Sequence, residues 1–193
     1  MGGVLIDNTA KDLIDYCAKV LNVSSESLKK VFTNYEISFM KGIISENELW
    51  GKVCKTLGAN VPQSDSLWKD AVRNVFKDKP EVYNLVLNLK TNGYKLGFLS
   101  NTEIPTMQYF HEMNYDKYFD AIVFSCAEQT VKPEEKIYSV CLEKLGVKPN
   151  EAIFIDDRID YVEGARKVGI TAILFVNIEQ LKRELFDLSV TIN

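Results

Sequence analysis

Between residues 12 and 76, apolar positions recur at the three- and four-residue spacing of helices, and no stretch has the pattern of a strand. The pattern predicts four amphipathic helices. They cover residues 12–21, 25–42, 45–58 and 67–75. Ser45 and Glu48 have the spacing of a capping box, in which a hydroxyl and a carboxylate satisfy backbone donors at a helix start. We expect the aromatic residues on these helices to form a bundle core rather than a ligand site.

From Pro80 onward, predicted helices alternate with short and nearly continuous apolar runs. The apolar runs cover residues 94–99, 121–124, 152–155 and 172–175. The helices cover residues 80–91, 104–114, 134–145 and 161–168. Apolar runs of this kind, separated by helices, are typical of parallel strands that are buried on both faces. The expected fold class is therefore α/β, with a Rossmann-like parallel sheet and an inserted all-helical segment.

The 193 residues carry a net charge of −4, from 23 Lys and Arg against 27 Asp and Glu, and they contain no basic block. Such a chain is a poor candidate for binding the phosphates of nucleic acid, so we expect no nucleic-acid partner. No apolar run approaches the roughly 20 residues that span a bilayer, so we expect no membrane association. The four cysteines lack metal-ligand spacing, and we expect reduced, buried thiols in a cytoplasmic protein.

Polar side chains follow three of the apolar runs. Ser100 and Asn101 follow the first run, and Lys132 lies in the loop after the second. Asp156 and Asp157 follow the third. Because parallel sheets bind ligands at the carboxyl ends of their strands, we expect these side chains to converge. A hydroxyl and an ammonium suit a dianionic phosphoryl group, and adjacent carboxylates suit Mg²⁺.

Each of these residues, taken alone, also has an ordinary structural explanation. Ser100 and Asn101 fit the start of a helix as N-cap residues, and Lys132 fits a loop lysine. The pair Asp156 and Asp157 fits a helix start, where carboxylates favour the helix dipole. The functional interpretation therefore depends on all of them occurring in order, at the ends of successive runs.

The combination resembles the haloacid dehalogenase (HAD) superfamily of phosphohydrolases, and the likeness covers nearly the whole chain. The second, third and fourth motifs of that superfamily are matched by Phe98–Thr102, Val131–Tyr138 and Phe154–Arg158. The residues Val162–Ala165 and Gly169–Ile170 continue the fourth motif. Tyr161 stands where many relatives carry asparagine, which is a departure from the pattern.

The resemblance implies a role for each of these residues. Ser100 and Lys132 would bind and stabilise the transferring phosphoryl group, and Asn101 would orient groups beside it. Asp157 would be the most direct ligand of Mg²⁺, with Asp156 next to it. The helical stretch would be a small cap inserted after the first strand. The implied domains are an α/β core of residues 1–11 and 77–193 and a cap of residues 12–76.

The first motif of the superfamily is a strand that ends in Asp-x-Asp, or in Asp-x-Gly in one branch, and its first aspartate is the nucleophile. Met1–Leu5 resembles the end of the Asp-x-Gly-Gly-Val-Leu variant, with Met1 at the x position. The resemblance therefore implies a nucleophile one position before Met1, at the end of a central strand. Gly2 would offer its carbonyl oxygen to Mg²⁺. An alternative is that Val4–Ile6 takes the place of that strand and presents Asp7 as the nucleophile.

The expected function is Mg²⁺-dependent hydrolysis of a small phosphorylated metabolite through an aspartyl-phosphate intermediate. The Asp-x-Gly branch includes sugar-phosphate phosphatases such as α-D-glucose-1-phosphate phosphatase, so a sugar phosphate is one expected substrate. We expect a shortened form of a working enzyme, with little turnover of its own. Two alternatives remain open. One is a non-catalytic module that binds a phosphorylated ligand or a protein, and the other is a haloacid dehalogenase, which needs no metal.

Overall fold

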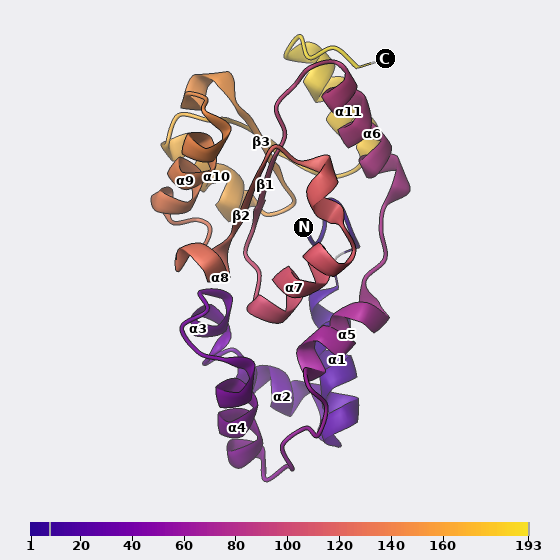
Figure 1. Cartoon of the computed structure of the whole chain (residues 1–193), viewed down its shortest axis with the longest axis vertical. Helices are drawn as coiled ribbons and strands as arrows, with labels where there is room; N and C mark the ends of the chain where they lie inside the picture. Colours follow the sequence, from indigo (N-terminus) through magenta and orange to yellow (C-terminus); the bar gives the residue numbers. More distant parts are fainter. Residues whose placement is uncertain (8, 193) are drawn as a thin grey trace.

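The computed structural model describes residues 1–7 and 9–192. Asn8 and Asn193, which fall within the ranges predicted for the α/β core, lie outside the described residues. Five helices from the first part of the chain gather at one end of the molecule (Figure 1). They are α1 (Ala10–Leu21), α2 (Ser25–Phe32), α3 (Glu36–Met40), α4 (Glu46–Leu57) and α5 (Leu67–Val75). These five helices are called the helical unit below.

Aromatic side chains form the centre of the helical unit. The rings of Phe32 and Trp68 are stacked, with centroids 5.1 Å apart and an angle of 3° between their planes. Phe39 meets Trp68 edge-on, with centroids 5.6 Å apart. Offset stacking and edge-on contacts are the favourable arrangements for aromatic pairs. These rings are buried, which confirms that the aromatic stripes form a bundle core.

The chain turns between α2 and α3, where the sequence predicts one continuous helix over residues 25–42. The turn falls at Thr33 and Asn34, whose side chains donate hydrogen bonds to the carbonyls of Lys29 and Lys30. Such bonds compete with a regular helix and favour a bend. The apolar spacing continues across the turn because both short helices present their apolar sides to the same core.

The rest of the chain alternates helices and parallel strands, which confirms the α/β class. Its main elements are α6 (Pro80–Thr91), β1 (Gly97–Ser100), α7 (Ile104–Glu112), β2 (Ala121–Phe124), α9 (Glu135–Leu145), β3 (Ile153–Asp156), α10 (Ile159–Lys167) and β4 (Thr171–Leu174). Elements that the pattern did not predict are η1 (Tyr115–Tyr118), α8 (Ser125–Glu128), η2 (Pro149–Glu151) and α11 (Ile178–Asp187). No helix within residues 1–7 and 9–192 has both the length and the apolar character needed to cross a lipid bilayer.

The strands form two separate parallel pairs. Strand β1 pairs with β2, with Leu99 opposite Val123, and β3 pairs with β4, with Ile155 opposite Ile173. Among the described residues no pairing joins β1 to β3, so the single sheet expected from the pattern is divided in two. Helices α9 and α10 lie to one side of the strands, and α6 and α11 lie to the other (Figure 1).

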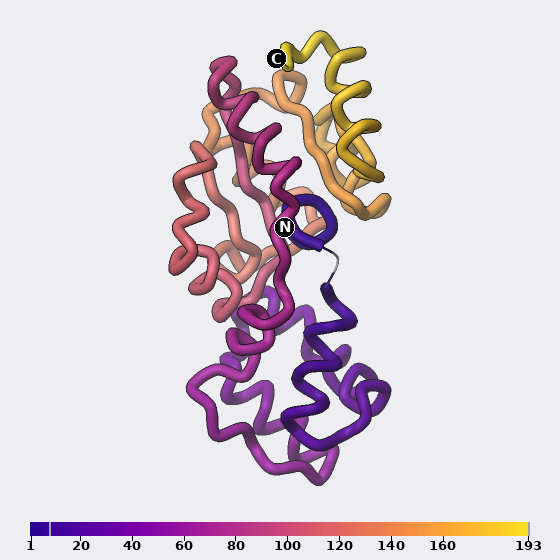
Figure 2. The backbone as a smooth tube through the Cα atoms, turned by 90° about the vertical axis from the view of Figure 1, so that its right-hand side faces the viewer, coloured from indigo at the N-terminus to yellow at the C-terminus, as the bar shows by residue number. Residues whose placement is uncertain are grey.

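The N-terminal segment, residues 1–7, does not join the two strand pairs. It lies beside α6, near the helical unit (Figure 2). Its backbone forms a turn, because Gly3 has a φ of +81° and the amide of Leu5 donates to the carbonyl of Met1 at 3.0 Å. Ile6 bridges Asp78 in an antiparallel direction. The segment is therefore not an extended strand between β1 and β3.

Candidate active site

The ammonium group of Lys132 connects the ends of the two strand pairs. Its Nζ donates to Asp156 Oδ2 at 2.6 Å and to the carbonyl oxygen of Leu99 at 3.2 Å. Leu99 belongs to β1 and Asp156 ends β3. Lys132 is only 5% exposed, and a charge so deeply buried requires a partner of opposite sign. The sequence reasoning correctly expects this lysine to meet the carboxyl ends of the strands.

Asn101 fixes the loop that carries Lys132. The Nδ2 of Asn101 donates to the carbonyl of Lys132 at 3.1 Å, and the amide of Lys132 donates back to Asn101 Oδ1 at 2.8 Å. Asn101 Nδ2 also donates to the hydroxyl of Tyr161, at 3.1 Å. The ring centroid of Tyr161 lies 4.9 Å from the Nζ of Lys132. Tyr161 therefore contributes to the site, although its residue type gave no reason to include it.

Ser100 ends β1 and is 2% exposed. Its Oγ accepts a hydrogen bond of 2.6 Å from Thr102 Oγ1. The amide of Thr102 donates to Ser125 Oγ, and that hydroxyl donates to the carbonyl of Met40 in α3. Hydrogen bonds made by the side chain and the backbone amide of Thr102 thus connect the end of β1, through Ser125, to the helical unit. Ser100 is next to Leu99, whose carbonyl accepts from Lys132. The hydrogen bonds of its own hydroxyl go to Asn101 and Thr102, so the predicted role of Ser100 beside Lys132 stays a prediction.

The two aspartates at the end of β3 differ in their surroundings. Asp156 is buried, and its Oδ1 accepts from the amide of Arg158 at 3.1 Å. Asp157 is half-buried, and burial, followed by the charge of Asp156, raises the pKa of its carboxyl. A side chain on Gly3 would overlap the Asp157 carboxylate. Only a glycine therefore allows the N-terminal segment to approach this carboxylate so closely.

The α-amino group of Met1 is buried near the charges of Lys132, Asp156 and Asp157. Burial, followed by the charge of Lys132, lowers the pKa of this group to about 5, while Asp156 and Asp157 act in the opposite direction. Gly2 lies in this segment, but its backbone bridges Ile6 rather than either aspartate. The predicted approach of Gly2 to the metal-binding acids therefore stays a prediction.

Asp7 lies elsewhere. Its side chain is 59% exposed, and its Oδ1 is 4.0 Å from the Nζ of Lys79. Because Ile6 bridges Asp78 rather than a strand of either pair, Val4–Ile6 does not present Asp7 to Lys132. The alternative that Asp7 replaces the nucleophile is wrong for this conformation.

The donor set fits a hard divalent cation only in part. Within the described residues there is no group of three or more His, Cys, Asp or Glu side chains that could hold a metal ion. Asp156 and Asp157 nevertheless supply adjacent carboxylates, and Mg²⁺ commonly takes one or two carboxylates and completes its shell with water and substrate phosphate. Burial and like charge both disfavour the ionised form of Asp157, and a cation beside it would favour that form. The pair therefore suits Mg²⁺.

The chain is similar in sequence to several known proteins. A sequence model of the haloacid dehalogenase-like hydrolases matches residues 1–169. The chain is 28% identical over 195 residues to acyl-CoA dehydrogenase family member 10 of Mus musculus, covering 95% of this chain and 18% of that protein. It is 28% identical over 106 residues to the phosphorylated carbohydrates phosphatase of Thermotoga maritima, covering 54% of this chain and 49% of that enzyme. The matched segments thus span less than half the length of these relatives.

Solved structures share the fold. A HAD family enzyme from Bacteroides thetaiotaomicron, crystallised with magnesium and inorganic phosphate, superposes with a TM-score of 0.75 and 24% identity. The superposition covers 94% of this chain and 95% of that one. At this identity the likeness shows the fold alone, whereas the sequence model covers most of the chain. The chain therefore belongs to the haloacid dehalogenase-like hydrolases.

Proposed function

We propose that this chain forms the phosphoryl- and magnesium-binding part of a phosphatase that acts on small phosphorylated metabolites. The observation that carries the proposal is the buried Lys132 ammonium, held between the end of β1 and the end of β3. Among the relatives, an enzyme named for phosphorylated carbohydrates supports the same substrate class.

The proposed roles follow from the positions of the groups. Lys132 places its positive charge where phosphoryl oxygens would bind, and Ser100 supplies a hydroxyl at the end of β1. Asn101 holds the Lys132 loop by paired hydrogen bonds. Asp156 and Asp157, with the carbonyl of Gly2, would hold Mg²⁺, which would neutralise phosphoryl charge.

The proposed chemistry is in-line attack by an aspartate carboxylate on phosphorus. The bond between phosphorus and the ester oxygen breaks, and the leaving alcohol gains a proton. Water then hydrolyses the aspartyl phosphate to release inorganic phosphate and restore the carboxylate. The family resemblance puts this aspartate one position before Met1. Lys132 and Ser100 would stabilise the charge that develops on the transferring group.

The helical unit is proposed to act as a cap over this site, with boundaries at residues 12 and 76. It reaches the α/β part beside the predicted phosphoryl ligands, through the bond from Ser125 Oγ to the Met40 carbonyl. The ion pair between Lys41 Nζ and Glu134 Oε1, at 2.7 Å, joins the same two parts. A cap at this position would select among phosphate esters by shape, and sugar phosphates are the first substrates to examine.

Binding of inorganic phosphate tests the proposal without requiring turnover. Calorimetry of the chain with phosphate should show binding that depends on Mg²⁺. The Lys132→Met and Asp157→Asn substitutions should each weaken it at least about tenfold, since each removes a charge-assisted contact. Lys144→Met is the matched control, because Lys144 pairs with Glu128 on the surface. Equal binding with and without Mg²⁺, or undiminished binding by Lys132→Met, would refute the proposal.

A further inference from the structure

The hydroxyl of Ser100 makes one short hydrogen bond and one long one. It accepts from Thr102 Oγ1 at 2.6 Å. Among the described residues it donates only to the carbonyl of Asn101, at 3.4 Å. Bonds between a hydroxyl and another oxygen normally measure about 2.5–3.0 Å, so this second contact is weak. An acceptor site of Ser100 is therefore occupied, while its proton is available to a ligand.

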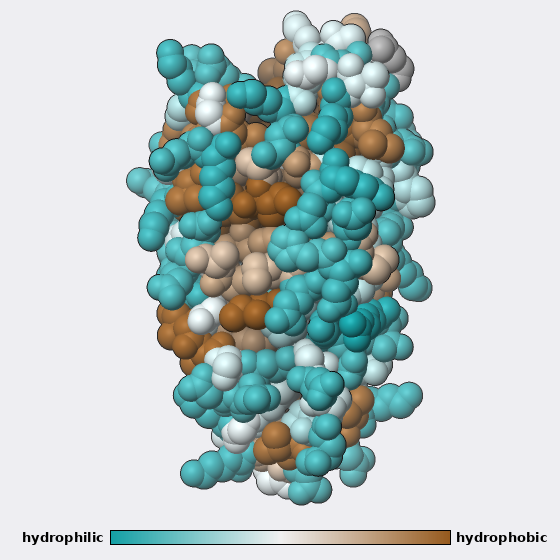
Figure 3. Space-filling view, in the orientation of Figure 1, coloured by the Kyte–Doolittle hydropathy of each residue, from teal (hydrophilic) through white to brown (hydrophobic). Residues whose placement is uncertain are grey.

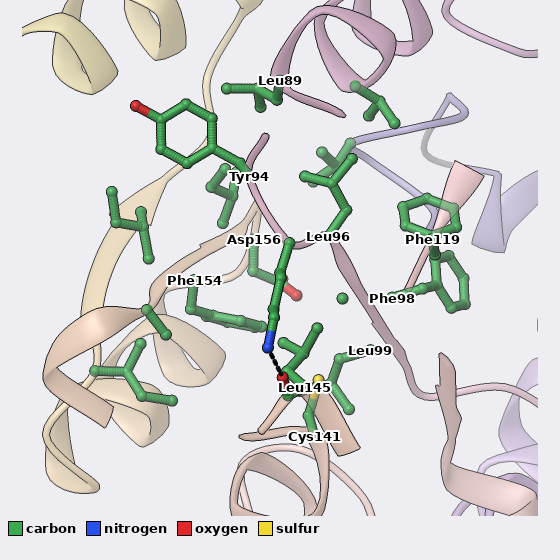
Figure 4. Close-up of a pocket in the computed structure, with 18 of the residues that line it drawn as sticks. Leu89, Tyr94, Leu96, Phe98, Leu99, Phe119, Cys141, Leu145, Phe154 and Asp156 are labelled. Atoms are coloured by element: carbon green, nitrogen blue, oxygen red, sulfur yellow. Dashed lines mark hydrogen bonds between the residues drawn. The ribbon is translucent and has the colours of Figure 1, made fainter. Parts of the chain in front are cut away.

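The pair of hydroxyls formed by Ser100 and Thr102 is shielded from water. Both side chains are buried. The described residues that line the apolar cavity of about 470 Å³ beside β1 include Leu99 and Asp156 (Figure 4), but neither member of the pair. Hydrophobic residues also cover the surface where Figure 1 draws β1 and β2 (Figure 3). Because buried hydroxyls need protein partners, the neighbours of Ser100 determine how its hydroxyl is oriented.

Thr102 is held in place by contacts other than that with Ser100. Its amide donates to Ser125 Oγ at 2.8 Å, and Ser125 Oγ donates to the carbonyl of Met40 at 2.6 Å. Ser125 belongs to α8 and Met40 to α3, so these bonds join Thr102 to the α/β part and to the helical unit. The β-branched side chain of threonine has few rotamers. The Thr102 hydroxyl therefore has a fixed position next to Ser100.

The Thr102 hydroxyl does not cap the helix that follows it. The N-cap of α7 is Glu103, and no side-chain hydrogen bond caps this helix. The hydrogen bond described for Thr102 Oγ1 is the one to Ser100 Oγ. The ordinary structural explanation for a threonine before a helix therefore does not account for this hydroxyl.

We propose that Thr102 is a positioning residue for Ser100, whose proton it directs toward the phosphoryl group by occupying an acceptor site of Ser100 Oγ. This role rests on the proposed function, because Ser100 binds the phosphoryl group there. Thr102 does not touch the ligand itself. Hydrogen bonds in a chain polarise one another, so the bond from Thr102 also makes the Ser100 hydroxyl a better donor.

Calorimetry of phosphate binding with Mg²⁺ tests this role. Thr102→Val removes the hydroxyl but keeps the shape of the side chain, and it should weaken phosphate binding at least about threefold. Thr102→Ser keeps the hydroxyl and should bind phosphate within about twofold of the original chain. Thr91→Val is the control, because the exposed Thr91 hydroxyl only bonds back to the carbonyl of Leu87. This control should bind phosphate as the original chain does.

Double substitutions separate positioning from a general loss of structure. In a chain that carries Ser100→Ala, Thr102→Val should cause no further loss of affinity, because the group that Thr102 directs is gone. In a chain that carries Asp157→Asn, Thr102→Val should keep its full effect, since no described contact joins Asp157 to Thr102 or Ser100. An equal loss with and without the Ser100 hydroxyl would show that Thr102 only supports the fold and would overturn the proposal.

Circular dichroism checks that each variant is folded, and Thr102→Ala replaces Thr102→Val if the valine variant is not. If the original chain binds phosphate with Mg²⁺ and Thr102→Val binds it equally well, the role of Thr102 is overturned while the proposed function stands. A loss by Thr102→Ser as large as that by Thr102→Val would also overturn this role alone. No binding by the original chain would refute the proposed function and this role together.

Discussion

At the residue scale, the site depends on one buried ion pair. Lys132 and Asp156 are 2.6 Å apart, and both side chains are less than a tenth exposed. Attraction between buried charges offsets their loss of hydration only when both partners are present. The pair lies between two strand ends that no described backbone pairing connects. It therefore joins the two halves of the α/β part as well as forming the proposed phosphoryl site.

The Lys132→Met substitution should lower the free energy of unfolding by about 3–5 kcal/mol, because it leaves Asp156 buried without its cation. The double substitution Lys132→Met with Asp156→Asn should recover much of that stability but not phosphate binding. Lys144→Met, which breaks a more exposed pair with Glu128, should change stability by less than about 1 kcal/mol. Urea denaturation measures all three variants. Equal losses for Lys132→Met and Lys144→Met would contradict the importance of the buried pair.

The thiols should be unreactive in the folded protein. All four cysteines are free and buried, as the sequence predicts. Burial raises the pKa of Cys17 to about 12 and the pKa values of Cys126 and Cys141 to about 11. The reactive thiolate is therefore scarce at pH 8. A chromogenic disulfide reagent should react slowly with the native protein and fully in urea. Rapid labelling of the native protein would show that these side chains are accessible.

At the element scale, the sequence predicts correctly those features that depend on residues close together along the chain. The capping box at Ser45 is present, with Ser45 Oγ accepting from the amide of Glu48 and Glu48 Oε2 accepting from the amide of Ser45. Helix α6 has the predicted bounds. The break between α2 and α3 and the division of the sheet were not predicted. Apolar spacing reports which residues are buried, but not whether a helix bends or which strand edges pair.

Removing the hydroxyl of Ser45 tests whether the capping box stabilises the protein. Ser45→Ala should lower the free energy of unfolding by about 1 kcal/mol, because the amide of Glu48 loses its acceptor. Thr56→Ala, in the same helix, is the control, since its hydroxyl only bonds back to the carbonyl of Lys52. That control should stay within about 0.5 kcal/mol of the original chain. Equal effects in chemical denaturation would show that the box adds no stability.

For the candidate site, too, the sequence could not predict features that depend on contacts between distant residues. The sequence allowed five candidate residues to be proposed because each follows an apolar run or lies in the loop before a helix, and their roles stay predictions: Ser100, Asn101, Lys132, Asp156 and Asp157. Tyr161 could not be proposed, because its role comes from a hydrogen bond to Asn101, sixty positions away, and from its ring beside Lys132. The proximity of Met1 to the aspartates likewise depends on the tertiary fold.

At the scale of the whole molecule, polar contacts hold the helical unit against the α/β part. Trp68 Nε1 donates to Glu103 Oε2 at 3.1 Å and to Thr106 Oγ1 at 3.0 Å. Burial raises the pKa of the Glu103 carboxyl, and the hydrogen bonds from Thr106 and Trp68 only partly oppose this. Glu103 closely follows Ser100 and Asn101, so this contact ties the helical unit to the segment that carries the proposed phosphoryl ligands.

The raised pKa of Glu103 predicts that the stability of the protein depends on pH. Because the pKa of Glu103 is higher in the folded than in the unfolded state, the folded protein holds the proton more tightly. The stability that Glu103 contributes is therefore fully present below the usual glutamate pKa of about 4.3. It is lost as the pH rises through the pKa that Glu103 has in the folded protein. Glu103→Gln, which is neutral at every pH, should be more stable than the original chain at pH 8 and should show a flatter profile. Parallel urea profiles for the two proteins would contradict this assignment.

Phosphate release tests the central claim most directly, using the chain extended at Met1 by Val-Ile-Val-Phe-Asp. With Mg²⁺ and a panel of sugar phosphates, this protein should release inorganic phosphate, whereas the matched extension ending in Asn should not. Lys132→Met in the Asp-ended protein should abolish the release, and a chelator should do the same. Equal release by the Asn-ended protein or by Lys132→Met would contradict the account. The account would also be contradicted if the Asp-ended protein released no phosphate although it binds phosphate with Mg²⁺ and its added residues are protected from amide hydrogen exchange.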